Sequence, residues 1–164
     1  MTLPIRDVEL DDLQCVLEMN EASVPHVNSV TLAQMQKFLD EAAYFRVAIV
    51  DGVPAGFLIG LTPDADYQSL NFRWFCDKYA SFAYIDRVAV AATARRRGLA
   101  AALYRDFEDS FNSQSPRLVC EVNLRPPNPA SMRFHERMGF VRVGSQEIDD
   151  GAKEVAMMVK ALVD

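Results

Sequence analysis

Residues 82–111 read FAYIDRVAVAATARRRGLAAALYRDFEDSF, and they predict a strand, a basic turn and a helix in succession. Phe82–Val90 is predicted to be a strand, in which alternate residues share one face. One face of that strand carries Tyr84, Asp86, Val88 and Val90. A helix is predicted from about Leu99 to Phe111, because large apolar residues recur there at helical spacing. These residues are Leu99, Leu103, Phe107 and Phe111.

The turn before this helix has the chemistry of an anion site. The first amides of a helix have no carbonyl partner within it, and the helix dipole adds partial positive charge at the same end. Gly98 and the small Ala100 allow the backbone to come close to a bulky phosphate. Three consecutive arginines, residues 95–97, add positive charge in a chain whose formal net charge is −6. The stretch Arg95–Ala101 therefore predicts a pyrophosphate-binding loop.

The sequence before residue 82 predicts one strand, two helices and a hairpin. They are a strand at Ile5–Val8, helices at Leu10–Glu21 and Leu32–Ala42, and strands at Tyr44–Val50 and Pro54–Leu61. Thr31 is a good cap for the second helix, whose expected apolar face begins at Leu32, and Asp51-Gly52 is a hairpin turn. Residues 62–81 predict a long irregular segment that is rich in aromatic side chains. Such a segment is either a functional lid or the cover of a satellite core.

The sequence after residue 111 predicts a strand, a helix and a final hairpin. They are a strand at Arg117–Val122, a helix that Asn128 caps and that ends at Met138, and strands at Phe140–Ile148 and Glu154–Leu162. The predicted order is β-α-α-β-β-β-α-β-α-β-β over a single domain, residues 1–164. This order favours an α/β (α+β) fold with a mixed, mostly antiparallel sheet and helices on both faces.

The composition excludes several classes of function. A net charge of −6 and a pI near 4.9 argue against nucleic-acid binding, which needs a basic face, and favour cationic substrates such as amines. No apolar run approaches the ~20 residues of a membrane span, and the amino terminus lacks the regions of a signal peptide. Cys15, Cys76 and Cys120 fit no metal or disulfide spacing. We therefore expect a cytoplasmic protein with no metal, no membrane association and no nucleic-acid partner.

Two motifs resemble those of the GCN5-related N-acetyltransferase (GNAT) family. VAATARRRGLA, residues 90–100, is similar to the family's Val-x-Pro-x-x-Arg/Gln-x-x-Gly-x-Gly/Ala, and it departs at Ala92, where proline is common. NPASMRFHERMGF, residues 128–140, is similar to the second motif, Asn-x-x-Ser/Ala-x-x-Leu/Phe-Tyr-x-x-x-Gly-Phe. The motifs occur in the family's order, and the predicted elements agree with the family over nearly the whole chain.

The resemblance implies a fold and a co-substrate. The expected sheet has six to seven strands and about four helices, and acetyl-CoA lies between splayed strands, here Phe82–Val90 and Arg117–Val122. An N–H near Val90 would polarise the thioester carbonyl. Family members are often dimers, so a homodimer is one expected assembly. The residues expected to bind acetyl-CoA are Val88, Ala89, Val90, Arg95, Arg96, Arg97, Gly98, Leu99, Ala100, Ala101, Asn128, Ser131 and His135.

The resemblance also names candidates for proton transfer when an amine attacks the thioester directly. His135 stands where the family has a tyrosine that protonates the leaving thiolate, and it either takes that role or only contacts CoA. Glu121 matches a glutamate of ribosomal-protein N-terminal acetyltransferases and is the first candidate for the base. Asp86, on the strand before the phosphate loop, is the alternative base, and water alone is the third. His26, in the loop between the first two helices, is either an acceptor contact or a surface residue.

Three functions fit this sequence. The first is acetyl transfer from acetyl-CoA to the primary amine of a small molecule, which a pocket covered by the aromatic segment would favour. The second is acetyl transfer to protein N-termini or lysines, which an open groove would favour. The third is a non-catalytic acyl-CoA-binding module, because the tyrosine of the second motif is replaced by His135.

Overall fold

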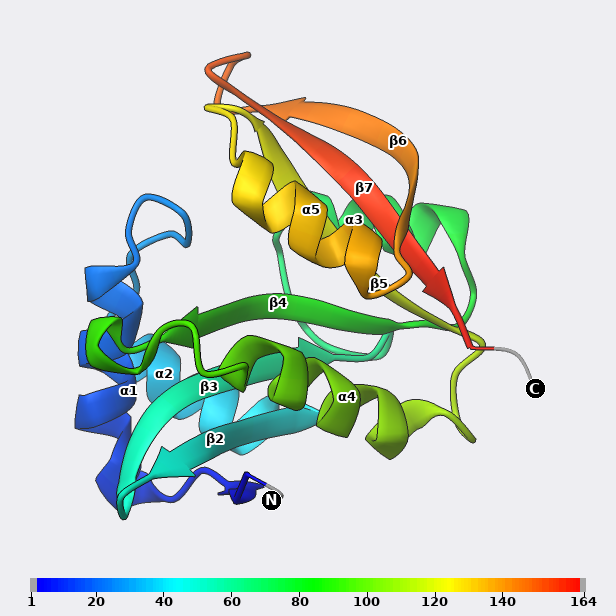
Figure 1. Cartoon of the computed structure of the whole chain (residues 1–164). Coiled ribbons are helices and arrows are strands. Elements are labelled where there is room, and N and C mark those ends of the chain that lie inside the picture. The colour runs from blue at the N-terminus through cyan, green and yellow to red at the C-terminus, as the bar shows by residue number, and fades with distance from the viewer. Residues whose placement is uncertain (1–2, 163–164) are drawn as a thin grey trace. The chain divides into compact units, whose positions relative to one another are not determined.

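The computed structural model describes residues 3–162 and folds them into seven strands, five α-helices and two short 3-10 helices. In chain order these are β1 (Ile5–Asp7), η1 (Leu10–Asp12), α1 (Leu13–Ala22), α2 (Leu32–Glu41), β2 (Tyr44–Val50), β3 (Val53–Leu61), α3 (Leu70–Lys78), β4 (Ala83–Val90), η2 (Ala92–Ala94), α4 (Leu99–Phe111), β5 (Arg117–Arg125), α5 (Pro129–Arg137), β6 (Val141–Ile148) and β7 (Lys153–Ala161). The strand order is β1-β2-β3-β4-β5-β7-β6 (Figure 1). Strand β4 pairs with β5 in parallel, whereas β1–β2, β2–β3, β5–β7 and β6–β7 are antiparallel. This confirms the predicted mixed, mostly antiparallel sheet.

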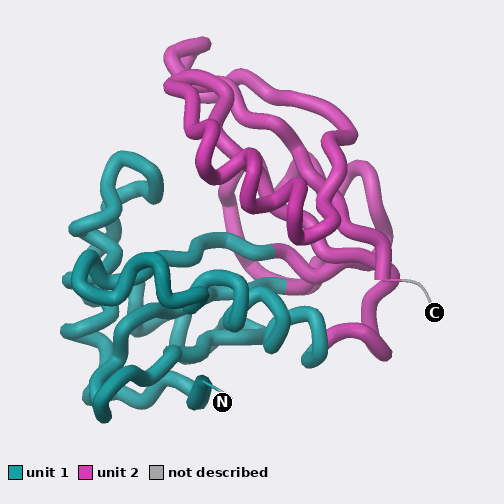
Figure 2. Tube along the Cα trace, in the orientation of Figure 1, with its two compact units in different colours: residues 1–61, 85–110 teal, residues 62–84, 111–164 magenta. Residues whose placement is uncertain are grey.

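The chain divides into two compact units, each made of two separate segments (Figure 2). The first unit comprises residues 1–61 and 85–110, and the second comprises residues 62–84 and 111–164. Strand β4 therefore contributes its first two residues to the second unit and the others to the first. The single domain expected for residues 1–164 stays a prediction, and cooperative unfolding is its test.

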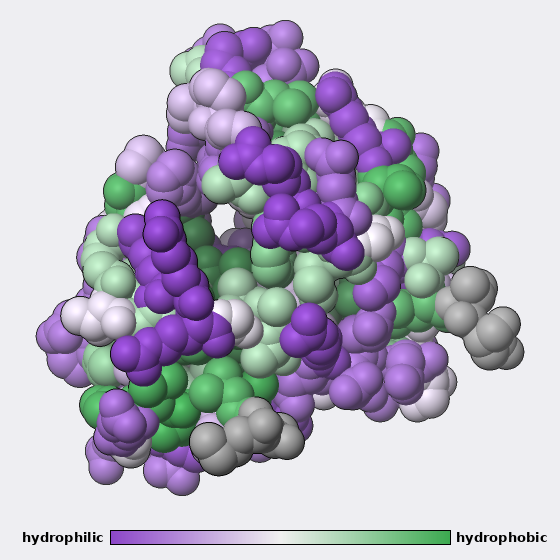
Figure 3. Space-filling model, viewed as in Figure 1, coloured by the Kyte–Doolittle hydropathy of each residue, from purple (hydrophilic) through white to green (hydrophobic). Residues whose placement is uncertain are grey.

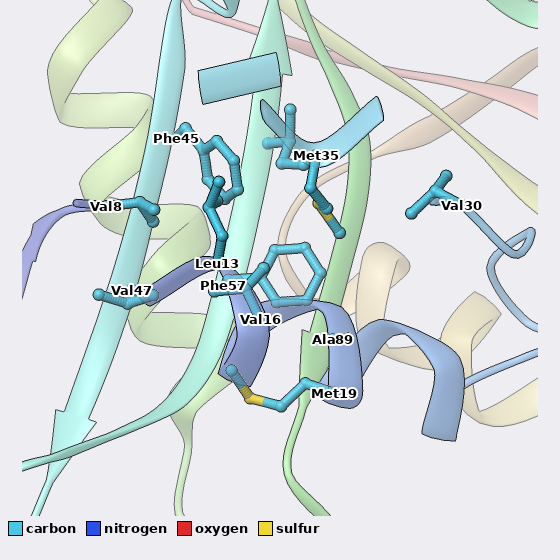
Figure 4. Packing of buried hydrophobic residues seen from close by; sticks show 11 residues of the cluster. Val8, Leu13, Val16, Met19, Val30, Met35, Phe45, Val47, Phe57 and Ala89 are labelled. Atoms are coloured by element: carbon cyan, nitrogen blue, oxygen red, sulfur yellow. The ribbon is translucent and has the colours of Figure 1, made fainter. Parts of the chain in front are cut away.

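An apolar core lies between the helices α1 and α2 and one face of the strands of the first unit (Figure 4). Alternate residues of a strand share a face, so Phe45 and Val47 of β2 both enter this core. Its members are Val8, Leu13, Val16, Met19, Val30, Met35, Phe45, Val47, Phe57, Ile59 and Ala89. The predicted cap of α2 is confirmed, because the side chain of Thr31 accepts from the amide of Gln34 at 3.1 Å.

Helix α4 packs on the opposite face of these strands. The Phe107 ring meets the Tyr44 ring edge-on, with centroids 5.0 Å apart. A glycine allows this approach, since a Cβ on Gly60 would lie only 2.2 Å from the Phe107 ring. The Tyr44 hydroxyl and the Arg46 guanidinium each donate to Asp106 of α4 at 2.8 Å. These contacts fix the helix whose first turn carries the predicted phosphate loop.

The second unit is built on the β5–β7–β6 ladder, and β5 joins β4 over two residue pairs, Ala83–Leu118 and Tyr84–Val119. Helix α3 lies against β6, because a Cβ on Gly144 would lie 2.8 Å from the Trp74 ring.

Helix α3 corrects the prediction of an irregular segment at residues 62–81. Ser69 caps it by accepting from the amide of Phe72 at 3.4 Å. Two of its nine residues, Phe72 and Phe75, are buried, and a single pair at this spacing is too short a pattern to predict a helix. Both rings pack against Tyr84, with centroids 5.4 and 6.0 Å away. The Phe72 and Phe75 rings thus belong to the core of the second unit. This agrees with the predicted alternative to a lid, in which the segment covers a satellite core.

Smaller differences concern the ends and faces of elements. The first turn of the helix predicted at residues 10–21 is the 3-10 helix η1, and β5 continues beyond Val122 to Arg125. Leu32, predicted on the apolar face of α2, is 46% exposed because the helix buries a narrower stripe centred on Met35. Both predicted hairpin turns are confirmed by positive φ angles, at Asp51-Gly52 and at residues 149–151.

Hydrophilic residues are spread over much of the face shown in Figure 3, where they are drawn in purple. Within residues 3–162, none of the helices is long and apolar enough to cross a membrane.

Candidate active site

The turn between β4 and α4 presents an exposed backbone at the start of a 13-residue helix. Residues 95–98 are all exposed, and Gly98 has a φ of +75°, which a glycine adopts without strain. The Gly98 carbonyl accepts the first bond of the helix, from the amide of Ala102 at 3.0 Å. By helix geometry, the amides of Leu99, Ala100 and Ala101 have no carbonyl one turn earlier to bind. The three arginines and these amides have the arrangement that an anion site needs.

One edge of β4 is directed away from β3. The amide of Ala91 donates to the carbonyl of Ala55 in β3 at 2.8 Å. Successive residues of an extended chain direct their N–H and C=O groups to opposite edges. Val88 and Val90 therefore direct their N–H and C=O groups away from β3. Ala89 directs its carbonyl group towards β3. Val88 and Val90, whose backbone groups form this edge, are among the residues that the resemblance expects to bind acetyl-CoA.

Asp86 lies in a buried ion pair with its neighbour Arg87. The carboxylate accepts from the guanidinium at 2.7 Å, and the two side chains are 4% and 3% exposed. The same guanidinium donates to the Asn20 side chain at 3.1 Å and to the Asn28 side chain at 2.8 Å. Asp86 is thus part of a network that ties β4 to the turn after α1.

Glu121 of β5 lies in a different polar cluster, in the second unit. The Tyr84 hydroxyl donates to both carboxylate oxygens, at 2.7 and 3.0 Å, and the Asn71 amide donates to Oε1 at 3.3 Å. The Gln146 amide in turn donates to Oδ1 of Asn71 at 2.9 Å. Tyr84 is fully buried, whereas Glu121 is half-buried. The carboxylate is therefore held in place by donors from two elements, β4 and α3.

His135 of α5 is buried between the aromatic rings of Phe134 and Phe140. Its Nδ1 lies 2.8 Å from the carbonyl oxygen of Ser131, and a carbonyl can only accept, so Nδ1 carries a proton. Burial lowers the pKa of His135, and the bond to Ser131 opposes that shift. A neutral ring with its proton on Nδ1 has an unprotonated Nε2. An acid role at Nε2 therefore requires the imidazolium form.

The other predicted site residues lie at the ends of helices. Asn128 caps α5 by accepting from the amide of Ser131 at 3.3 Å, as predicted. His26 is exposed in the turn after α1. Among the described residues, no group of three or more His, Cys, Asp or Glu side chains is placed to hold a metal ion.

The structure brings together some predicted residues and adds others. The arginine loop and Asp86 belong to the first unit, whereas Glu121 and His135 belong to the second. Sequence reasoning missed Tyr84, Asn71 and Gln146 as partners of Glu121. No local signal in the sequence points to Tyr84, because its contact with Glu121 depends on the β4–β5 register, in which Tyr84 pairs with Val119, two residues before Glu121.

Comparison with known proteins agrees with the motifs. A model of the acetyltransferase (GNAT) family matches residues 10–140. No curated protein matched the sequence.

Three solved structures illustrate the likeness in fold. The ribosomal-protein-S18-alanine N-acetyltransferase from Escherichia coli has a TM-score of 0.75 and 18% identity, over 98% of this chain and 94% of that chain. Ard1 from Thermoplasma volcanium has a TM-score of 0.80 and 21% identity over the whole of both chains. Naa20 from Chaetomium thermophilum, in complex with a bisubstrate analogue, has a TM-score of 0.74 and 19% identity, over 97% of this chain and 86% of that chain. At these identities the likeness shows the fold.

Proposed function

Because the chain belongs to the acetyltransferase (GNAT) family, we propose that this acetyl-CoA-dependent N-acetyltransferase acetylates the α-amino group of a peptide or protein. The carboxylate of Glu121 carries the proposal, since the Tyr84 hydroxyl holds it at 2.7 and 3.0 Å. Its position matches the glutamate of ribosomal-protein N-terminal acetyltransferases. The fold likeness to the enzyme that acetylates the alanine of ribosomal protein S18 supports the same class of acceptor.

A small-molecule amine is the second candidate acceptor. The net charge of −6 supports it, because a negative surface attracts cations in general. The aromatic segment gives it less support than the sequence suggested, because Phe72 and Phe75 are buried in a core and do not cover a pocket. A free α-amine is also a cation near neutral pH, so charge alone does not favour the small molecule.

Acetyl-CoA supplies the acetyl group and leaves as a thiol, and two parts of the first unit fit its binding. The amides at the start of α4 and the three arginines would hold the pyrophosphate. The edge of β4 at Val88 and Val90 would pair with the pantetheine arm as a further strand does. An N–H near Val90 would polarise the thioester carbonyl. The family motif assigns further cofactor contacts to Asn128, Ser131 and His135.

Three proton transfers complete the proposed mechanism. Glu121 takes one proton from the ammonium group, which leaves a neutral amine to attack the thioester carbonyl. The attacking nitrogen loses a second proton to water as the tetrahedral intermediate collapses, and the leaving thiolate takes a proton from His135 in its imidazolium form or from water. Asp86 remains the alternative base, but its buried ion pair with Arg87 commits its carboxylate to structure. Glu121 is therefore our first choice.

The decisive experiment measures release of free CoA with matched peptides. One set has a free amino terminus, the same set is chemically blocked there, and a third set contains polyamines and single amino acids. We expect turnover with the free peptides and none with the blocked ones, and mass spectrometry should place the acetyl group on the α-nitrogen. Acetylation confined to lysine side chains or to small amines would reject the peptide acceptor.

The role of Glu121 has its own test in the Glu121→Gln variant. A positioned general base contributes ~10²–10⁴-fold in rate, so turnover at neutral pH should fall at least about tenfold. An α-amine has a pKa of ~7.7–8.0, so the loss should shrink at pH 9, where the amine is already neutral. Full activity at neutral pH would shift the base to Asp86 or water. Binding of acetyl-CoA without turnover on any amine would indicate a non-catalytic module.

We also propose that the protein works in the reducing cytoplasm. Cys15, Cys76 and Cys120 are all free thiols. Burial raises the pKa of the Cys120 thiol well above its ordinary value, which keeps it protonated and unreactive.

A further inference from the structure

Two amide side chains lie in series behind the carboxylate of Glu121. Gln146 of β6 donates from Nε2 to Oδ1 of Asn71, at 2.9 Å. Asn71, in the first turn of α3, then donates from Nδ2 to Oε1 of Glu121, at 3.3 Å. The three residues come from three elements of the second unit, so the series exists only in the folded protein.

The direction of this series is fixed by chemistry at its carboxylate end. An ionised carboxylate only accepts hydrogen bonds, whereas each amide side chain both donates and accepts. Asn71 must therefore turn its NH₂ group towards Glu121 and its oxygen towards Gln146. If the Asn71 amide were reversed, its oxygen would face the carboxylate oxygen and its nitrogen would face the nitrogen of Gln146. Both contacts would be repulsive, whereas in the observed orientation the Asn71 amide has a partner at each end, with Gln146 donating to its oxygen.

We propose that Asn71 is a positioning residue for Glu121 and that Gln146 keeps the Asn71 amide in the orientation that positioning requires. The inference rests on the proposed role of Glu121 as the base. The Tyr84 hydroxyl contacts both oxygens of the carboxylate and restrains it from β4. Asn71 contacts only Oε1 and so distinguishes the two oxygens. The segment predicted to be irregular, residues 62–81, thus supplies a contact to the proposed base.

The geometry explains why two fixed donors matter for a base. A general base must lie within about 3 Å of the proton it accepts, and a misplacement of about 1 Å can cost about a hundredfold in rate. A glutamate side chain on a strand has several rotatable bonds. Restraint from α3 and β4 together therefore decides where the carboxylate meets the amine.

The test uses isosteric substitutions that remove donors without removing volume. Asn71→Asp has the shape of asparagine but directs a carboxylate oxygen at Glu121. Gln146→Glu removes the donor to Oδ1 and, as an acceptor, stabilises the reversed Asn71 amide. The matched control is Asp77→Asn, an exposed residue on the same helix. Each variant is assayed for kcat and KM with a free peptide at pH 6.5 and at pH 9, beside Glu121→Gln.

We expect both isosteric variants to lower kcat about tenfold or more at pH 6.5 and to recover most of it at pH 9, with an unchanged KM for acetyl-CoA. The control should match the wild type at both pH values. An equal loss at both pH values would show a merely structural role and overturn the inference. Full activity of both variants, while Glu121→Gln is impaired, would overturn the positioning role and leave the base assignment standing. Full activity of Glu121→Gln would overturn the base assignment and the positioning role with it. If Asn71→Asp does not fold, Gln146→Glu alone decides between these outcomes.

Discussion

The contact between β3 and α4 leads to a quantitative prediction for Gly60→Ala. A Cβ at residue 60 would lie 2.2 Å from one atom of the Phe107 ring and 2.8 Å from the next. Carbon atoms make ordinary contact at ~3.5–4.0 Å, so the ring would have to retreat by more than about 1 Å. Phe107 is fully buried and packs edge-on against Tyr44, whose hydroxyl is bonded to Asp106. The ring therefore has no open space on that side.

Two opposing effects set the size of the change in free energy of unfolding. Overpacking a buried site costs ~1–3 kcal/mol, whereas replacing glycine with alanine stabilises by ~0.4–1 kcal/mol through the unfolded chain. Because the clash is severe, we expect a net loss of about 2 kcal/mol. For a chain of 164 residues this corresponds to a fall in Tm of about 4–8 °C. Urea unfolding followed by circular dichroism would measure it.

Two further variants make the reasoning refutable. Gly56→Ala lies in the same strand, and its Cβ would meet the Ala89 carbonyl at 3.3 Å, so its cost should be smaller. Combining Gly60→Ala with Phe107→Leu should cost at least about 1 kcal/mol less than the sum of the single changes, since the shorter side chain relieves the clash. Strictly additive effects, or a Gly60→Ala protein as stable as the wild type, would refute the packing argument.

The other predictions concern the phosphate loop, the Asp86–Arg87 pair, His135 and the two units. Gly98→Glu should abolish acetyl-CoA binding in calorimetry, because it adds a negative charge beside the phosphates. Asparagine tolerates a positive φ and adds no charge, so Gly98→Asn should bind acetyl-CoA more weakly but measurably. Unchanged affinity in Gly98→Glu would reject the phosphate loop. Arg87→Met should lose ~3–5 kcal/mol in urea unfolding because it leaves Asp86 buried without its cation, and adding Asp86→Asn should restore part of the loss. Burial lowers the pKa of His135 in the folded protein, so that the unfolded chain binds a proton at this residue more readily as the pH falls below about 6.5. The free energy of unfolding should therefore decrease as the pH falls, by at most about 1.4 kcal/mol per pH unit. His135→Asn should weaken this dependence. The same ring can act as an acid only if kcat falls as the pH rises through that lowered pKa, and a flat profile would assign the acid role elsewhere. Finally, unfolding should follow one transition by circular dichroism and by calorimetry, because β4 contributes to both units, and two transitions would contradict the single domain.

Local signals explain which parts of the fold could be predicted from the sequence. The bounds of α4 agree with the prediction, because its apolar stripe runs from Leu99 to Phe111. The caps at Thr31 and Asn128 were also predicted, since capping depends on the residue and its next three neighbours. Helix α3 was missed because it buries only Phe72 and Phe75, and the residues that it packs against, Tyr84 and Gly144, lie on other elements.

In the candidate site too, local sequence patterns predict some features, whereas others depend on contacts between separate elements. The arginine loop could be read from adjacent residues, and the Ser131–His135 bond follows from helical spacing. The cluster around Glu121 could not, because it depends on the parallel register of β4 with β5 and on the placement of α3 and β6. Asp86 was predicted as an alternative base from its place on the strand, but no local pattern predicts that the adjacent Arg87 is buried with it.

The contact of Trp74 with Gly144 gives the protein an intrinsic optical reporter. Trp74 is the only tryptophan of the chain, so its emission needs no label and no assignment. Its indole lies over a glycine of β6, flanked by the ammonium group of Lys78 at 5.3 Å from the ring centroid. Any loosening of α3 would bring water to the indole and shift the emission to longer wavelength. Because Asn71 lies on the same helix, fluorescence during a titration with peptide can show whether the support of Glu121 tightens as the acceptor arrives.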